Sequence, residues 1–402
     1  MSTAPRGERS IIALVGRRNA GKSSLINALV GQEIAIVSEV PGTTTDPVDK
    51  HYELLPLGPV TFYDTAGVDD EGELGKKRVA STRKILYRAD IVLFVNDGLA
   101  FDAHELELLA RIHEMQIPTL MIFNKSDLRP VDPQNISYCE SQKIEYEIVS
   151  ATTAIGIVEA KNKLIQLAPK YLNEDRVIVG DMLKQKSRVI LVAPIDSAAP
   201  KGRLILPQVQ AIRDILDHDA ICIVVKETEL TDALAMLKEP ADMVITDSQA
   251  IEQVNRETPD NIELTTFSIL FARYKGELDI LISGIKAIDK LQDGDKVLIA
   301  EACSHHVQKD DIGRVKLPRW LREYTGKDLK FEIYAGHDFP ENLEEYAVCV
   351  HCGGCMINAM EMNRRILECH RRGVPITNYG LTITQVHGAF DRAIAPLLRV
   401  KK

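Results

Sequence analysis

The chain has 402 residues, and at about 150 residues per domain this length predicts two to three domains. Hydrophobic residues make up 45% of the chain and charged residues 27%, a balance typical of soluble globular proteins that excludes a disordered or fibrous chain. The net charge of −9 argues against a protein whose main work is to coat nucleic acid.

Residues 11–170 alternate short β-branched runs with segments of helical periodicity. The expected strands are 11–15, 60–63, 91–95, 119–123 and 147–150, and the expected helices are 23–30, 103–115 and 155–168. Strands and helices that alternate in this way predict a parallel sheet with helices on both faces. A polar, turn-rich stretch at 171–175 then marks a boundary.

The same rhythm restarts twice after this boundary. The middle stretch has expected strands at 189–195, 221–225 and 242–246 and expected helices at 207–216 and 231–237. The last stretch has expected strands at 265–272, 296–300, 331–334, 347–350 and 375–377 and expected helices at 278–291, 357–369 and 390–398. We therefore predict three α/β domains with mostly parallel sheets, at residues 1–172, 173–262 and 263–402.

The first expected strand is followed by the sequence Gly16-Arg17-Arg18-Asn19-Ala20-Gly21-Lys22-Ser23, which opens the first expected helix. This is the G-x-x-x-x-G-K-S pattern of a phosphate-binding P-loop. Its glycines let successive backbone N–H groups point at phosphate oxygens, and the helix N-terminus adds positive potential. We expect Lys22 to neutralise the β- and γ-phosphates and the Ser23 hydroxyl to hold Mg²⁺. The residues predicted to bind the nucleotide here are Gly16, Asn19, Ala20, Gly21, Lys22, Ser23 and Ser24.

Three further motifs after expected strands predict that the nucleotide is a guanine nucleotide. Asp64-Thr65-Ala66-Gly67 places a carboxylate near Mg²⁺ and the Gly67 amide near the γ-phosphate. In Asn124-Lys125-Ser126-Asp127, the Asp127 carboxylate can accept hydrogen bonds from the ring N–H and the amino group of guanine, which adenine does not offer. Ser150-Ala151 places an amide where it can meet the guanine oxygen.

With these motifs, residues 10–170 resemble a translation-factor-type P-loop GTPase domain. The segment Pro41-Gly42-Thr43-Thr44-Thr45-Asp46 is similar to the switch segment of bacterial tRNA-modification and ribosome-assembly GTPases. The resemblance implies Thr44, ahead of Thr43, as the switch threonine and as a Mg²⁺ ligand beside Ser23 and Asp64.

One position departs from the pattern of signalling GTPases. Val68 stands where those proteins carry the glutamine that orients water. In the resembled group, an asparagine at the Asn19 position helps to bind K⁺, which acts as a positive charge near the phosphates. We therefore expect slow, potassium-stimulated GTP hydrolysis, with Lys22, Thr44 and Asn19 as its catalytic residues.

The chain has seven cysteines, and an odd number in a chain with no visible signal peptide argues for thiols or metal ligands rather than for a disulfide framework. Cys303-Ser304-His305 and His351-Cys352-Gly353-Gly354-Cys355 follow the expected strands 296–300 and 347–350. If those strands are parallel in one sheet, both motifs leave it at the same edge. Three thiolates with an imidazole or an open position suit a 4Fe–4S cluster or zinc.

The fourth ligand of this site is open among His305, His306, His337 and His351, and the ambiguity favours a cluster with one exchangeable iron over structural zinc. Packing roles are predicted for the other cysteines, which are Cys139, Cys222, Cys349 and Cys369. One exposed helix face is predicted for the arginine pairs Arg364-Arg365 and Arg371-Arg372.

A GTPase domain followed by C-x-H and H-C-G-G-C resembles the maturation GTPase of FeFe-hydrogenase, the HydF family, along nearly the whole chain. The resemblance implies a middle dimerisation domain, a C-terminal cluster domain, a homodimer and a cytoplasmic location. It also implies Cys303, Cys352 and Cys355 as ligands of a 4Fe–4S cluster, with His305 or His351 as a replaceable fourth. Such a protein is a scaffold that carries a two-iron subcluster precursor, made with two radical-SAM maturases, to apo FeFe-hydrogenase.

Two functions of other classes remain open from the sequence. One is an RNA-directed GTPase of tRNA modification or ribosome assembly with a C-terminal zinc site, which the acidic balance and the absence of a basic aromatic signature oppose. The other is a redox switch in which Cys352 and Cys355 form a disulfide. No apolar run approaches the roughly 20 residues that span a bilayer, so we expect no membrane partner. Because of the acidic balance, we also expect no nucleic-acid partner.

Overall fold

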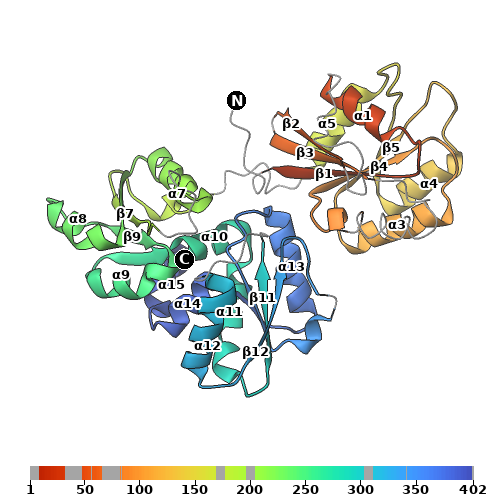
Figure 1. Ribbon diagram of the computed structural model, residues 1–402. Helices are drawn as coiled ribbons and strands as arrows, with labels where there is room; N and C mark the ends of the chain where they lie inside the picture. The colour runs from red at the N-terminus through yellow and green to blue at the C-terminus, as the bar shows by residue number, and fades with distance from the viewer. Residues whose placement is uncertain are drawn as a thin grey trace. The chain divides into compact units, whose positions relative to one another are not determined.

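The computed structural model describes residues 9–31, 48–55, 57–65, 82, 84–168, 177–195, 204–302, 311–340 and 342–400 (Figure 1). The chain forms two compact units, Met1–Asp175 and Arg176–Lys402. Five predicted or candidate site residues lie outside the described residues, namely Thr44, Gly67, Cys303, His305 and His306. Within the described ranges, no helix is both long enough and apolar enough to cross a membrane.

The first unit is built on a sheet whose described strands have the order β2-β3-β1-β4-β5-β6. Its strands are β1 (Ser10–Val15), β2 (Val48–Leu54), β3 (Gly58–Asp64), β4 (Ile91–Asn96), β5 (Thr119–Phe123) and β6 (Glu145–Ile148). Neighbouring strands pair in parallel except for β2, which runs antiparallel to β3 at the sheet edge. The sequence of β2, VDKHYEL, has the charges of an edge strand, and a search for apolar runs therefore does not find it.

Helices cover both faces of this sheet because its central strands are apolar on both sides. α1 (Lys22–Val30) and α5 (Ile157–Leu167) pack on one face. α3 (Ala103–Glu114) and α4 (Pro133–Gln142) pack on the other. The prediction of a parallel sheet between two helical layers is thus confirmed, with β2 as an addition.

The second unit contains two sheets, and the described strands of each are parallel. The first sheet has the order β10-β9-β7-β8 and consists of β7 (Arg188–Val192), β8 (Ile221–Val225), β9 (Met243–Thr246) and β10 (Glu263–Thr266). The second sheet has the order β12-β11-β13-β14 and consists of β11 (Lys296–Glu301), β12 (Lys330–Ala335), β13 (Val348–His351) and β14 (Ile376–Asn378). The division of this part of the chain into separate domains at 262 and 263 stays a prediction.

Helices follow the strands of both sheets (Figure 1). Around the first sheet they are α7 (Leu206–Asp217), α8 (Leu230–Met236), α9 (Ile251–Glu257) and α10 (Phe267–Lys275). The others are α11 (Leu278–Ile285), α12 (Leu317–Thr325), α13 (Ala359–Arg371), α14 (Tyr379–Val386) and α15 (Phe390–Val400). Short helical turns lie at Gly180–Met182, Glu227–Glu229, Ser248–Ala250, Ile288–Lys290, Ile312–Lys316 and Leu343–Glu345.

One predicted strand, 265–272, is wrong. β10 ends at Thr266, and α10 begins at Phe267. The Thr266 hydroxyl accepts a hydrogen bond from the Ile269 amide over 3.2 Å, which caps the helix and ends the strand at this residue. The apolar run is buried almost all round, so its sequence has no period that separates a strand from a helix.

The second sheet is covered closely by α11, and Gly284 makes this contact possible. A Cβ atom on Gly284 would lie 1.9 Å from the carbonyl oxygen of Ile376 on β14, which is backbone and cannot turn aside. Alanine favours an exposed helix interior over glycine by about 1 kcal/mol, but here the steric clash has the opposite sign. The close approach of helix and strand therefore depends on the missing side chain.

We predict that Gly284→Ala lowers the free energy of unfolding by about 1–3 kcal/mol or more, the usual range for an overpacked core. Ser283→Ala is the matched control, because Ser283 is exposed on the same helix. Urea denaturation followed by circular dichroism measures both variants. Equal stability of the two variants would contradict the tight packing of α11 on β14.

Candidate nucleotide and cysteine sites

The P-loop has the backbone that its glycines predict. Gly16 has φ +144°, and a Cβ atom there would lie 2.0 Å from the carbonyl oxygen of Val95 on β4. Gly21 has φ +93° and leads into α1. The buried Lys22 side chain curls over the loop, and its Nζ donates to the carbonyls of Gly16 (2.9 Å) and Arg17 (2.7 Å). The amine therefore lies at the loop that is predicted to cradle the phosphates.

Arg17 ties the P-loop to the start of α3, a contact that the sequence pattern does not reveal. Its guanidinium forms a 3.0 Å ion pair with Asp102, pairs with Glu105 and donates to the carbonyl of Ala100. Glu105 is fully buried, and it also accepts a hydrogen bond from Asn96 at the end of β4. Burial raises the pKa of Glu105, while the Arg17 charge opposes the rise. Arg17 occupies a variable position of the motif, so nothing in the spacing points to this role.

The residues predicted to hold Mg²⁺ meet in the described part of the site. Asp64 is the last residue of β3, and its carboxylate accepts a hydrogen bond from the Ser23 hydroxyl. β1 and β3 are parallel neighbours, so the P-loop and Asp64 leave the sheet at the same edge. Thr44, the third predicted Mg²⁺ ligand, lies outside the described residues.

Asn124 connects two of the predicted nucleotide-binding loops. Its Nδ2 donates to the carbonyl of Ala20 in the P-loop over 3.0 Å. Its Oδ1 accepts from the amide of Ala151 over 3.0 Å. This amide was predicted to meet the guanine oxygen, and in this structure it serves the asparagine. Ser150 is buried beside it and accepts a hydrogen bond from the Thr153 amide.

The remaining described residues of the nucleotide site are more open. Asp127 is exposed on the loop after β5, where its carboxylate is available to a base. Lys125 and Asn19 both have left-handed backbones, with φ of +64° and +62°. Asparagine tolerates this conformation better than most residues. Asn19 is exposed in the P-loop.

The cysteine motifs follow two strands that are parallel neighbours, which is the condition for both motifs to leave the sheet at the same edge. On β11 and β13, Ala300 lies opposite His351, and the Cys352 amide donates to the Ala300 carbonyl over 2.8 Å. The Cys352 Sγ in turn accepts hydrogen bonds from the amides of Ala302 (3.0 Å) and Gly354 (3.4 Å). Cys303 follows Ala302 directly in sequence, and its own placement lies outside the described residues.

This sulfur environment fits a metal-bound thiolate. Backbone N–H groups that donate to sulfur stabilise its negative charge and tune the clusters that it ligates. Burial raises the pKa of the Cys352 thiol to about 11, and the two donating amides oppose the rise. Burial also raises the pKa of Cys355, against the nearby charge of Lys275. Among the described residues there is no group of three or more side chains that could hold a metal ion, and Cys303 lies outside them.

His351 has both ring nitrogens engaged inside the protein. Its Nδ1–H group donates to the Cys352 carbonyl over 2.8 Å, and its Nε2 accepts from the Arg365 guanidinium over 3.1 Å. Burial and the Arg365 charge lower the pKa of His351 to about 3, so the ring is neutral. Arg365 also donates to Glu361 (2.7 Å) and to the carbonyl of Gly336 (2.8 Å). In this conformation His351 holds the start of the cysteine loop through its hydrogen bond to the Cys352 carbonyl.

The prediction that the arginine pairs on α13 form one exposed face is wrong for Arg365. Its side chain is 1% exposed, and its ring neighbour is Phe339, with the guanidinium carbon 5.3 Å from the ring centroid. His337, another candidate fourth ligand, lies 3.0 Å from the buried Glu361 carboxylate. Helical spacing alone does not reveal this buried network, because arginine is among the residues most often exposed.

The other cysteines occupy packing positions within the described residues. Cys139, Cys349 and Cys369 are buried, and Cys222 is half-buried on β8. Burial and the neighbouring Cys369 raise the pKa of the Cys349 thiol well above its usual range. These thiols lie in apolar clusters, which agrees with their predicted role.

Three family models match the chain. A 50S ribosome-binding GTPase model matches residues 11–125. The hydrogen maturase F dimerization domain matches residues 178–276, and the hydrogen maturase F tetramerization domain matches residues 279–396.

Several curated relatives match part of the chain. The tRNA modification GTPase MnmE of Endomicrobium trichonymphae is 33% identical over 166 residues, which are 39% of this chain and 35% of that protein. MnmE of Parasynechococcus marenigrum is 46% identical over 134 residues, which are 31% and 29%. The GTPase Der of Kosmotoga olearia is 33% identical over 205 residues, which are 48% and 45%. The matched part of the chain thus spans less than half the length of each of these relatives.

Solved structures that match part of the chain include the G domain of the T. maritima FeoB iron transporter and Era in complex with MgGDPNP and 16S ribosomal RNA nucleotides. The first is 24% identical, covers 40% of this chain and 98% of its own, and has a TM-score of 0.32. The second is 18% identical, covers 54% and 93%, and has a TM-score of 0.34.

The P-loop, the guanine motifs and the parallel sheet define the first unit as a P-loop GTPase domain, joined to a second unit with two further α/β sheets. The two hydrogen maturase F models cover both of those sheets. The chain belongs to the hydrogen maturase F (HydF) family.

We predict that Asp127→Asn changes the base preference of the nucleotide site. The amide replaces a carboxylate acceptor with an N–H donor, which suits the second carbonyl of xanthine and repels the amino group of guanine. Two hydrogen bonds to a charged group are worth about 1.5–3 kcal/mol each, so GTP affinity falls on the order of 10²–10⁴-fold. Titration of GTP and XTP against both proteins measures the change. A variant that keeps its GTP affinity would contradict the assignment of Asp127 to the base.

Proposed function

We propose that this chain is a GTP-hydrolysing scaffold of FeFe-hydrogenase maturation that binds a 4Fe–4S cluster and carries a two-iron precursor to apo-hydrogenase. The observation that carries the proposal is the parallel pairing of β11 with β13, which brings the chain ahead of Cys303 onto the sulfur of Cys352. Membership of the hydrogen maturase F family supports hydrogenase maturation as the process in which this site acts. The partners are two radical-SAM maturases and apo FeFe-hydrogenase, in the cytoplasm.

In the GTPase domain, the phosphates bind between the P-loop amides and Lys22, and Mg²⁺ binds at Ser23, Thr44 and Asp64. Asp127 and the loop at Ser150-Ala151 receive the base, held in place by Asn124. Hydrolysis is slow because Val68 stands where a water-orienting glutamine acts in other GTPases. Asn19 faces out from the P-loop and holds K⁺ near the phosphates, where a positive charge stabilises the transition state.

In the cysteine site, Cys303, Cys352 and Cys355 hold the 4Fe–4S cluster. When bound, the cluster supplies one iron with an exchangeable coordination position. His305 stays a candidate for that position. His351 supports the loop instead, because coordination would require it to give up the hydrogen bonds with Cys352 and Arg365.

The chain acts as a homodimer through the β10-β9-β7-β8 sheet of its second unit. β8 is an edge strand of that sheet, and Ile221 and Val224 on it are 48% and 44% exposed. An unpaired edge with apolar side chains is a template for pairing with another strand. The other edge strand, β10, packs against α15.

The cluster assignment is tested by anaerobic reconstitution with iron and sulfide. The wild-type chain becomes brown, absorbs in the visible and gives an EPR signal after reduction, and Cys352→Ala loses these properties because it removes a ligand. Cys222→Ala is the control, since Cys222 lies on the other sheet and packs as a half-buried residue. A colourless wild-type chain with bound zinc would overturn the proposal and favour the RNA-directed GTPase.

The potassium assignment is tested by GTP turnover at equal ionic strength in K⁺ and in Na⁺. A cation near the phosphates contributes several kcal/mol, so we expect turnover to be roughly 10-fold or more faster in K⁺. Asn19→Ala is expected to lose this stimulation and to keep its slow turnover in Na⁺. Equal turnover of the wild-type chain in the two salts would contradict the role of Asn19.

A further inference from the structure

Helix α10 lies between the two sheets of the second unit and belongs to the cores of both. Phe267, Leu270 and Phe271 pack in the cluster that also contains residues of β7 and β9. Ile269 and Ala272 pack in a second cluster, which joins residues of β7 and β9 with residues of β11 and β13. A shift of this helix against either sheet would therefore be felt by the other.

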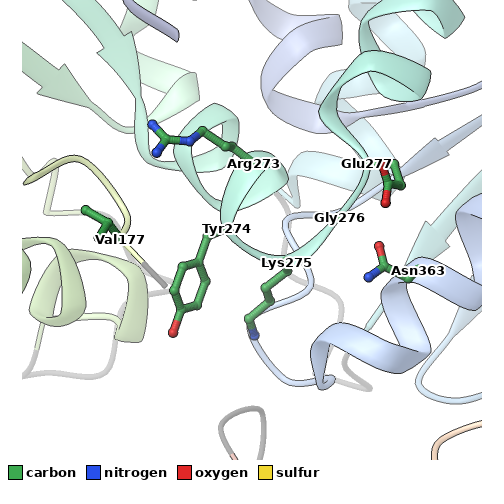
Figure 2. Close-up of a pocket in the computed structure, with 7 residues that line it drawn as sticks. All are labelled: Val177, Arg273, Tyr274, Lys275, Gly276, Glu277 and Asn363. Carbon is green, nitrogen blue, oxygen red and sulfur yellow. The ribbon is translucent and has the colours of Figure 1, made fainter. Parts of the chain in front are cut away.

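The last residue of α10, Lys275, reaches the cysteine loop. Its Nζ donates to the carbonyl of Gly354 and to the carbonyl of Ile357, each over 3.0 Å. These two carbonyls lie on either side of Cys355 in the sequence, so one amine closes the turn that carries the cysteine. Figure 2 shows the Lys275 side chain extending from the end of α10 toward the loop that precedes α13.

Lys275 is 2% exposed, which is rare for a lysine. Burial of an ammonium group is unfavourable unless hydrogen bonds and nearby negative charge offset the lost hydration. Its two carbonyl acceptors supply hydrogen bonds that offset part of this cost. Because these two carbonyls flank Cys355 in the sequence, the ammonium group lies at the turn that carries this cysteine.

We propose that Lys275 is a positioning residue of the cysteine site, which holds the Cys352–Cys355 turn in its ligating conformation and places a positive charge beside the bound cluster. This inference rests on the proposed function for its cluster, but the contact with the turn is a property of the protein itself. Lys275 ends α10, and α10 also packs against the β10-β9-β7-β8 sheet, which the hydrogen maturase F dimerization model covers. Lys275 therefore connects this sheet with the turn that presents two of the thiols.

A neighbouring residue offers a matched control. A cavity of about 260 Å³ lies at the end of α10, and both Lys275 and Arg273 line it (Figure 2). Arg273 is a cation on the same helix, but its guanidinium pairs with Asp181. Arg273→Met therefore removes a charge from the same neighbourhood without removing the contacts of Lys275.

The test compares Lys275→Met with Arg273→Met in the full-length chain. In the iron-free protein, hydrogen–deuterium exchange at residues 353–358 is expected to become faster in Lys275→Met alone. After reconstitution, iron loss to a chelator is expected to become about 10- to 100-fold faster in Lys275→Met, the usual effect of losing a partner behind a ligand. The midpoint potential is expected to become more negative, because a nearby cation stabilises the reduced cluster.

Equal exchange at residues 353–358 and equal iron loss in the two variants would overturn the proposal. An unchanged midpoint potential in Lys275→Met would overturn the part that concerns charge, since lost packing alone does not remove a positive charge. If Lys275→Met does not fold, Lys275→Gln and Arg273→Gln are compared in the same way. A wild-type chain that takes up no cluster would contradict the proposed function, and the exchange measurement would still decide whether Lys275 holds the turn.

Discussion

On β11 and β13, Ala300 lies opposite His351, and the Cys352 amide donates to the Ala300 carbonyl. This parallel register determines where both cysteine motifs leave the sheet. Residues that follow adjacent parallel strands emerge at one edge, so a motif near residue 303 and one near residue 352 meet there although the chain between them is long. A shift by one residue would turn the following side chains to the other face. The sulfur of Cys352 would then lose the Ala302 amide.

The same constraint builds the nucleotide site in the first unit. The P-loop follows β1, Asp64 ends β3, and Asn124 follows β5, all at the carboxyl edge of one sheet. Asn124 then adds a lateral connection, because its side chain bonds to the P-loop at Ala20 and to the next loop at Ala151. Strand direction brings the groups near one another, and a few buried polar side chains fix their spacing. Arg365 and Lys275 have the corresponding task at the cysteine loop.

The sequence was informative where a motif stands directly after an apolar strand. The P-loop, the guanine motifs and the order of strand and helix in the first unit were predictable for this reason. The strand predicted at 265–272 failed because Thr266 caps a helix inside a continuously apolar run, where no period is visible. β2 was missed because its residues are those of a polar edge strand.

Buried charges were the second limit of sequence reasoning. Arg365 was predicted to be exposed, since a charged residue at helical spacing usually faces water. Its burial depends on Glu361 one turn earlier on α13 and on His351 and Gly336 from two other places in the chain, and the i,i+4 spacing of Glu361 and Arg365 does not by itself indicate burial. Lys275 was missed in the same way, because its acceptors are backbone carbonyls, which carry no sequence signal.

We infer that parallel strands assemble three thiolates around one iron–sulfur centre. Native mass spectrometry of the anaerobically purified chain tests it most directly, since it weighs the protein together with its inorganic partner. We expect an added mass of one 4Fe–4S cluster per chain. A single zinc ion without sulfide, or a chain lighter by the two hydrogens of a Cys352–Cys355 disulfide, would contradict it.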